Sequence, residues 1–168
     1  MMSPARSPNT DIMTEQHLTA LHVFIVQAKR ACYVGDGHKL LPYRLASHDL
    51  QYAEGPWVYH DSYLAERDFI GQEIVYADSK PVWGMNYYGC ILKPELISSA
   101  QAGSIIKESL AAMYAENRFL GGFRHQTQGM QYVDTSSGDF CGFAGIEWIV
   151  CSGQRVYELH YHGGLLRA

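Results

Sequence analysis

The sequence predicts an α+β protein in which antiparallel sheet packs against two helices. Two stretches carry apolar residues at three- and four-residue steps, which is the spacing of one helical face. Each stretch is followed by about four short aromatic and β-branched runs, separated by Gly, Pro, Asp and Ser. The chain therefore reads as two αββββ units, at about residues 14–92 and 98–166. Whether the units share one sheet or form two is left open by the sequence.

The first helix is expected over residues 14–32, before Gly35 and Gly37 end the pattern. Its apolar face consists of Leu18, Leu21, Ile25 and Ala28. The second helix is expected over 98–117 and opens with Ser98 and Gln101 in the spacing of a capping box. Its apolar face consists of Ala102, Ile105, Ile106, Leu110 and Met113.

Eight strands are expected, four after each helix. They lie near residues 49–54, 57–63, 68–76, 81–88, 122–128, 130–135, 140–151 and 154–162. The segment 34–48 is too long for a minimal connection, and loops of that length are often functional or mobile. Residues 1–12 predict a disordered tail, so the folded domain is expected over 13–168.

The two units share residues at an offset of 74. Between 71–89 and 145–163, five aligned positions are identical: Gly71/Gly145, Glu73/Glu147, Val82/Val156, Tyr87/Tyr161 and Gly89/Gly163. An internal duplication is the favoured interpretation, because the helices also precede corresponding strands. Two hairpins that converged on similar Gly and aromatic spacing are the alternative.

Composition excludes several classes of protein. The 168 residues are 47% hydrophobic and 18% charged, which excludes a disordered chain and a coiled coil. The net charge of −4 disfavours binding of nucleic acid through its phosphates. The sequence contains no apolar run of membrane-spanning length and no secretory signal. A cytoplasmic protein is expected, with its four cysteines as buried thiols rather than as two disulfides.

Alternation along the strands assigns the side chains to faces. Glu73 and Glu147 lie inside otherwise apolar strands, where a carboxylate needs a partner or a solvent-filled space. The last strand of each unit has one apolar and one polar face. We expect a common core that consists of Leu21, Ile25, Met85, Ile106, Leu110, Ile146, Trp148 and Leu159.

Three runs resemble a bacterial domain family of unknown function: SHDLQYAEGPWVYHDSY (47–63), FIGQE (69–73) and PVWGMNYYG (81–89). That domain occurs alone and as the C-terminal part of Xre-type helix-turn-helix regulators. The resemblance implies a cytoplasmic sensor or partner module and supplies no reaction or catalytic residue. The stretch before the first helix is expected to be too short to contain a DNA-binding domain.

The residues themselves predict a small-molecule- or partner-binding module, with its pocket between the two units. The expected ligand-binding residues are Glu73, Trp83, Asn86, Tyr88, Glu147, Tyr157, His160 and His162. We expect no cofactor, because the sequence lacks a phosphate-binding loop. The catalytic residues are unknown, and a homodimer is left open.

A small enzyme that uses Glu and His is the alternative function. The run Glu158-x-His160-x-His162 places three potential metal ligands on one strand face. A further ligand would come from Glu73, Glu147, His125 or His60. An H-x-H pair alone is weak evidence, so no metal is assigned. A purely structural domain is the third possibility.

Overall fold

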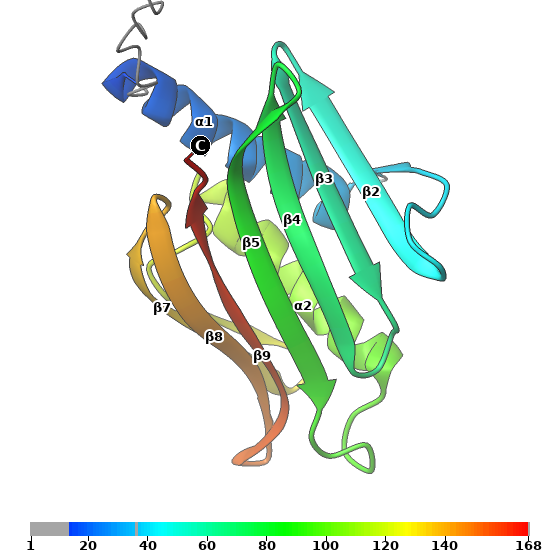
Figure 1. Cartoon of the computed structure of the whole chain (residues 1–168). Helices are drawn as coiled ribbons and strands as arrows, with labels where there is room; N and C mark the ends of the chain where they lie inside the picture. The colour runs from blue at the N-terminus through cyan, green and yellow to red at the C-terminus, as the bar shows by residue number, and fades with distance from the viewer. Residues whose placement is uncertain (1–13, 36, 168) are drawn as a thin grey trace, which may run out of the picture.

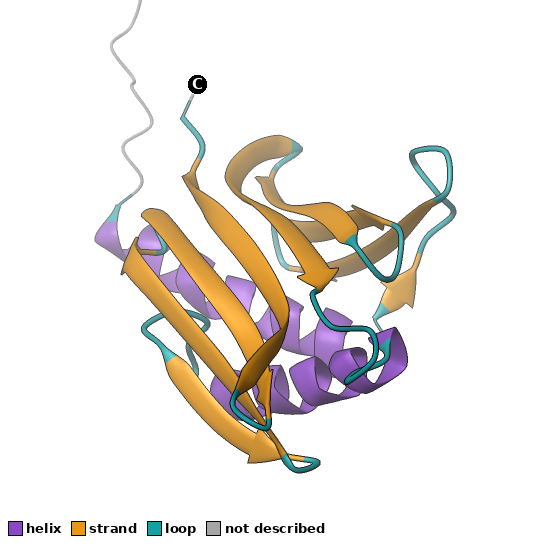
Figure 2. Ribbon diagram, turned by 90° about the horizontal axis from the view of Figure 1, so that it is seen from below, coloured by secondary structure: helices purple, strands orange, loops and turns teal. Residues whose placement is uncertain are grey.

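A computed structural model describes residues 14–35 and 37–167, so the tail predicted for residues 1–12 lies outside it. One continuous antiparallel sheet of nine strands carries the helices on a single face (Figure 1). The sheet curves strongly around the helices (Figure 2). Within the described residues, no helix is both long and apolar enough to cross a bilayer. The protein is thus α+β, and the two predicted sets of strands share one sheet.

Two α-helices precede the two sets of long strands. They are α1 (Glu15–Lys29), which continues into the π-helical turn η1 (Arg30–Val34), and α2 (Ser99–Ala115). Each begins at a predicted residue, because the hydroxyls of Thr14 and Ser98 accept hydrogen bonds from the amides of His17 and Gln101. The side-chain cap predicted at Ser98 is therefore confirmed.

The first half of the sheet holds β1 (His38–Lys39), β2 (Ser47–Glu54), β3 (Trp57–Leu64), β4 (Phe69–Ala77) and β5 (Lys80–Ile91). The second half holds β6 (Phe123–Thr127), β7 (Met130–Asp139), β8 (Gly142–Cys151) and β9 (Gln154–Leu165). The spatial order is β1-β2-β3-β4-β5-β9-β8-β7-β6. The halves therefore meet where β5 pairs with β9. The short strand β1 was not predicted and lies in the segment 34–48.

Three of the hairpins turn through two residues with positive φ. Asp78 and Ser79 join β4 to β5, Ser152 and Gly153 make the corresponding turn from β8 to β9, and Gln128 and Gly129 join β6 to β7. Positive φ at both turn residues matches the right-handed twist of the strands. These turns fix the register of the long hairpins.

The strand register is the same in the two halves. Glu73 lies opposite Met85 in β4–β5, and Glu147 lies opposite Leu159 in β8–β9. Tyr87 and Tyr161, which are 74 residues apart in sequence, lie directly opposite each other where β5 meets β9. Equivalent positions of the two halves thus meet at the centre of the sheet.

The helices cover a core made of alternate residues of each strand. Of the eight residues predicted for the core, Leu21, Ile25, Met85, Leu110 and Leu159 are buried. Ile106 is only partly buried and borders a cavity. The prediction for Ile146 and Trp148 is wrong.

Glu147 explains that error. In β8 the face toward the helices carries Phe143, Glu147 and Ile149, so the neighbouring apolar residues face outward. The Trp148 ring instead packs under Arg155, whose guanidinium lies 4.3 Å from the ring centroid. When a strand carries an acid on its buried face, hydrophobicity alone assigns the inner and outer faces of the strand the wrong way round.

We predict that Leu110→Ala and Leu159→Ala each destabilise the protein by about 2–3 kcal/mol. Both side chains are buried between α2 and the sheet, and both border an existing cavity, which favours the lower end of the range for such truncations. Chemical denaturation measures the loss, with Ile146→Ala as the outward-facing control. A loss below about 1 kcal/mol at both leucines would contradict the assigned faces.

Candidate functional site

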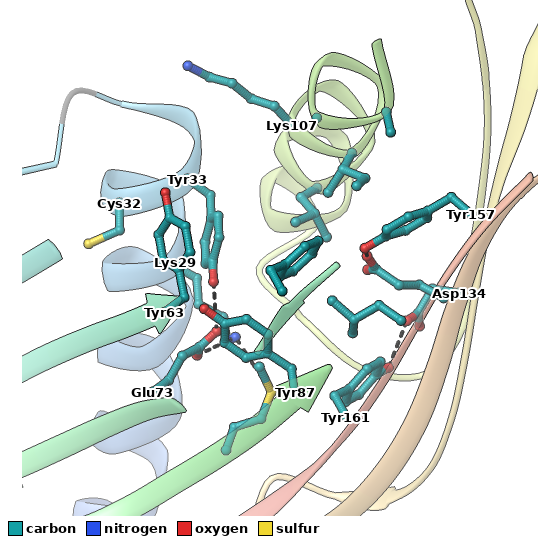
Figure 3. A pocket seen from close by; sticks show the side chains of 18 of the residues that line it. Lys29, Cys32, Tyr33, Tyr63, Glu73, Tyr87, Lys107, Asp134, Tyr157 and Tyr161 are labelled. Carbon is teal, nitrogen blue, oxygen red and sulfur yellow. Dashed lines mark hydrogen bonds and ion pairs between the residues drawn. The ribbon is translucent and has the colours of Figure 1, made fainter. Parts of the chain in front are cut away.

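A cavity of about 470 Å³ lies between the helices and the sheet, and both halves of the chain line it. Its walls are mostly apolar and come from β2, β4, β5, β9 and α2: Leu50, Phe69, Met85, Ile91, Ala102, Ile106, Leu110, Met113 and Leu159. The volume is that of a small-molecule site. One acidic cluster lies on each side of it (Figure 3).

The exposed residues of the lining show where the cavity reaches the surface. They come from the β3–β4 turn, at Ala65, Glu66 and Arg67, and from the first three turns of α2, at Gly103 and Lys107. These two segments therefore form its opening. A β-carbon added at Gly103 would meet no atom within 4 Å, so the opening is not packed shut at that residue.

In the first half, two acids lie opposite each other on neighbouring strands. Asp61 of β3 and Glu73 of β4 are register partners, and both face the helices. Lys29, from the end of α1, places its ammonium 2.6 Å from the Glu73 carboxylate. The hydroxyl of Tyr33, in η1, lies 3.2 Å from an oxygen of each acid. This pair of acids is therefore held by a cation and by hydroxyls.

The second half repeats the acids with different partners. Asp134 of β7 lies opposite Glu147 of β8. The hydroxyls of Tyr132 and Tyr157 donate one hydrogen bond to each oxygen of Glu147. Tyr161 donates to one oxygen of Asp134 at 2.7 Å, while the other oxygen, Oδ1, is buried without a hydrogen-bond partner.

Two glycines let tyrosines reach acids two strands away. Tyr87 lies over Gly71 of the adjacent strand, and its hydroxyl donates to Asp61 at 2.7 Å. A β-carbon at Gly71 would lie 2.2 Å from the Tyr87 ring. Gly145 leaves the same space for Tyr161, at the same 2.2 Å. The glycine–tyrosine pairs common to both halves of the sheet therefore position the buried acids Asp61 and Asp134.

Burial dominates the titration of these carboxyl groups. It raises the pKa of Asp61 to about 7, with a further upward contribution from the charge of Glu73. It also raises the pKa of Glu147 to about 7, against the opposing hydrogen bonds of its two tyrosines. The pKa of Asp134 rises to about 6 for the same reason, opposed by the Tyr161 hydrogen bond. These three carboxyl groups therefore titrate near neutral pH.

The protein should lose stability as the pH rises from about 4 to 7. The raised pKa values mean that the folded state keeps protons which the unfolded chain releases over that range. Each such carboxyl contributes a slope of up to about 1.4 kcal/mol per pH unit. Urea denaturation at pH 5, 6, 7 and 8 measures the slope, which Glu147→Gln should reduce. A free energy of unfolding that increases across this window would contradict the assignment.

Three of the eight predicted ligand-binding residues line the cavity: Glu73, Glu147 and Tyr157. Trp83 is on the same face of the sheet but is fully buried beside it, where its indole donates to the Phe140 carbonyl at 2.9 Å. Trp83 thus supports the cavity wall without reaching the space inside.

The other four predicted residues lie on the opposite face of the sheet. Asn86 is the register partner of His162, and Tyr88 is the partner of His160, across β5 and β9. The expectation that one pocket joins them to Glu73 and Glu147 is wrong, because side chains of adjacent strand residues point to opposite faces. They form a separate outer patch, of which Asn86 and His162 border a shallow depression. Whether any of the eight residues binds a ligand stays a prediction.

The same separation excludes Glu73 and Glu147 as further ligands for the metal-site alternative, to which the sequence assigned no metal. His160 and His162 face outward, while Glu73 and Glu147 are buried beneath the helices. In the described part of the chain, no three His, Cys, Asp or Glu side chains are placed to hold a metal ion. All four cysteines are free thiols, as the sequence predicted, but only Cys32 is buried, whereas Cys90, Cys141 and Cys151 are partly exposed.

Sequence reasoning missed Lys29, Asp134 and Tyr161, which line the cavity, and Asp61, which is buried opposite Glu73 without lining it. The available signal was the alternation Tyr59-x-Asp61, which recurs as Tyr132-x-Asp134 at an offset of 73. Two acids at matching positions of the two halves indicate a shared buried face.

The model of a family described as a domain of unknown function (DUF5680) matches residues 61–166. The matched range begins in β3 and includes the four acids described above, Asp61, Glu73, Asp134 and Glu147, whereas α1 and Lys29 precede it. A search of curated proteins and a search of solved structures each return no match. The match confirms that the sequence resembles a family of unknown function, and it supplies no ligand or reaction.

Proposed function

The chain belongs to the DUF5680 family of domains of unknown function, and we propose from its cavity that it binds a small organic molecule. A single observation carries the proposal: Asp134 lines the cavity, and its oxygen Oδ1 is buried without a hydrogen-bond partner. An acceptor buried without a hydrogen bond costs about 1–3 kcal/mol, and a bound donor would remove that cost. Most of the wall is apolar, with a few polar groups to orient a ligand.

The fold supports a sensor-like role for this binding. Lys29 and Tyr33 at the end of α1, Met113 on α2 and Tyr157 on β9 all border the cavity. A bound molecule would therefore contact both helices and both halves of the sheet. Occupancy would stabilise their packing by about 2.7 kcal/mol at 100 times the dissociation constant.

Binding of the neutral fluorophore N-phenyl-1-naphthylamine tests the proposal. Its two-ring system suits an apolar space of this size, and its emission increases when water is excluded. We expect saturable, one-to-one fluorescence enhancement with the wild-type protein. Gly103→Trp should abolish it, because the new ring would stand in the opening, where the β-carbon meets open space.

Ala100→Trp is the matched control, since Ala100 is an exposed residue of the same helix that does not line the cavity. It should bind the dye as the wild type does. Equal loss of binding in both variants, or no enhancement by the wild type, would overturn the proposed cavity function. Circular dichroism and thermal unfolding of both variants establish that they are folded.

General acid–base catalysis is the second candidate. The neighbouring carboxyls of Asp134 and Glu147 have raised pKa values of about 6 and 7, in the range that suits proton transfer at neutral pH. No histidine lines the cavity within the described residues, so the Glu–His pair expected from the sequence is not available there. Nuclear magnetic resonance spectra of a bound molecule, recorded over hours, distinguish the two candidates. A binding module leaves the molecule chemically unchanged, whereas an enzyme converts it to a product.

An internal duplication is proposed as the origin of this site. The common strand register, the paired Gly–Tyr positions and the direct facing of Tyr87 and Tyr161 all support it. Superposition of 14–92 on 98–166 should place Glu73 on Glu147. We also propose a cytoplasmic location, which the four free thiols support because such thiols persist in reducing compartments.

A further inference from the structure

We infer that the molecule taken by the cavity is an organic cation, a primary amine with an apolar body, whose ammonium lies against Asp134. This inference rests on the proposed function and specifies its ligand class. It follows from the charges around the cavity, from the one carboxylate oxygen that lacks a partner, and from the aromatic wall beside it.

The buried charges do not balance. Four carboxyl groups are buried beneath the helices, at Asp61, Glu73, Asp134 and Glu147, and Lys29 is the only buried cation in the described residues. The Lys29 ammonium already forms an ion pair with Glu73, and the side chains of Lys29 and Glu73 are only 4% and 1% exposed. A cationic ligand would reduce this excess of negative charge.

The imbalance is concentrated in the second half. Asp134 and Glu147 receive hydrogen bonds from tyrosines alone, and the residues that α2 places at this end of the cavity are Met113 and Tyr114. The nearby cation Arg118 is engaged elsewhere: its guanidinium lies 2.7 Å from Glu116 and donates to the carbonyls of Leu120 and Gly122. A ligand ammonium would act here as Lys29 acts in the first half.

Asp134 Oδ1 supplies the point of attachment. The residue is 3% exposed, borders the cavity, and uses its other oxygen to accept from Tyr161. A charge-assisted hydrogen bond from an ammonium would satisfy Oδ1. An anionic ligand would instead add a like charge to the cluster, and a neutral alcohol would leave the charge uncompensated.

The wall next to these acids suits the rest of such a ligand. Tyr157 stacks with Phe69, with ring centroids 6.5 Å apart, and both rings border the cavity. Aromatic faces attract cations and cover apolar groups. Leu110 and Leu159 extend the apolar surface toward the first half.

Three isosteric probes test the charge: 2-phenylethylammonium, 2-phenylethanol and phenylacetate. Calorimetric titration at pH 8 should show the ammonium binding at least tenfold more tightly than the alcohol, with no detectable binding of phenylacetate. The same titration at pH 5.5 should weaken ammonium binding about fourfold or more, because Asp134, with a pKa of about 6, is then mostly protonated and Glu147, with a pKa of about 7, almost fully so. Asp61, Glu73, Lys29 and Arg118 are the other charged groups around the cluster.

Asp134→Asn removes the charge with little change in shape, and it should reduce ammonium affinity at least tenfold while changing alcohol affinity less than threefold. Asp61→Asn is the matched control, because that buried acid receives hydrogen bonds from Tyr33 and Tyr87 and does not line the cavity. It should change ammonium affinity less than threefold. Equal losses in both variants would overturn the assignment of Asp134.

Displacement of N-phenyl-1-naphthylamine separates failure of this inference from failure of the proposed function. If the wild type binds the dye but the ammonium binds no better than the alcohol, the cavity function stands and the cationic ligand is overturned. If neither the dye nor any of the three probes binds, the proposed function itself fails.

Discussion

Replacing Lys29 with Met should destabilise the protein by about 3–5 kcal/mol at pH 8, the largest loss expected of any single substitution here. Methionine keeps much of the length of the side chain and removes only its charge. Glu73 would then keep its carboxylate 1% exposed without a counter-ion, opposite the second buried acid Asp61. Removal of one partner from a buried ion pair leaves a charge whose hydration has not been replaced.

Chemical denaturation of four proteins measures the effect: the wild type, Lys29→Met, Glu73→Gln and the double variant. The double variant should be more stable than Lys29→Met, since it has no unpaired carboxylate at position 73. The loss in Lys29→Met should also be smaller at pH 5, where Asp61, whose pKa is about 7, is protonated and no longer adds its charge to that of Glu73. Lys107→Met, at an exposed position of α2, is the control and should change the free energy of unfolding by less than about 0.5 kcal/mol. Equal losses for the two lysines would show that the buried pair has no special role.

Gly145→Ala should destabilise the protein by about 3 kcal/mol, through overpacking together with a lost buried hydrogen bond. The added β-carbon would lie 2.2 Å from the Tyr161 ring, so the ring must move. Movement of that ring would break the 2.7 Å hydrogen bond to Asp134, whose other buried oxygen already lacks a partner. Thermal and urea denaturation would show the loss, and Gly71→Ala should behave similarly through Tyr87.

Gly103→Ala provides the matched control for these two substitutions. It lies within α2, and its new β-carbon would meet no atom within 4 Å. We expect a gain of about 1 kcal/mol, because alanine is the better helix former. A destabilisation by Gly145→Ala no larger than about 0.5 kcal/mol would show that the tyrosine ring can move without cost.

The repeated order of one helix and four strands was predictable from local signals. Apolar spacing around Leu21 and Ile105, the cap at Ser98 and the polar turns between strands are encoded within a few residues. The single sheet was not predictable, because it depends on the pairing of β5 with β9, which are distant in sequence. Strand β1 was missed because two residues carry no periodic signal.

The site was predictable only in part. Glu73 and Glu147 were identified because acids in apolar strands require an explanation, and both line the cavity. Their partners come from other elements: Lys29 from a helix and Asp61 from a neighbouring strand. The polar residues Asn86 and His160 were grouped with them by chemistry, although strand alternation places them on the outer face. Polar character alone could not show which polar face was the buried one.

The unequal partners of the two acid pairs give the cavity a direction. At one end the ammonium of Lys29 neutralises Glu73, and at the other Asp134 has no cationic partner. Although the surrounding strands are arranged alike, an unsymmetrical amine would therefore bind in one orientation only. A linear diamine that spanned the space would bring its second ammonium toward Lys29, where like charges repel. The cavity should consequently discriminate between monoamines and diamines of equal length.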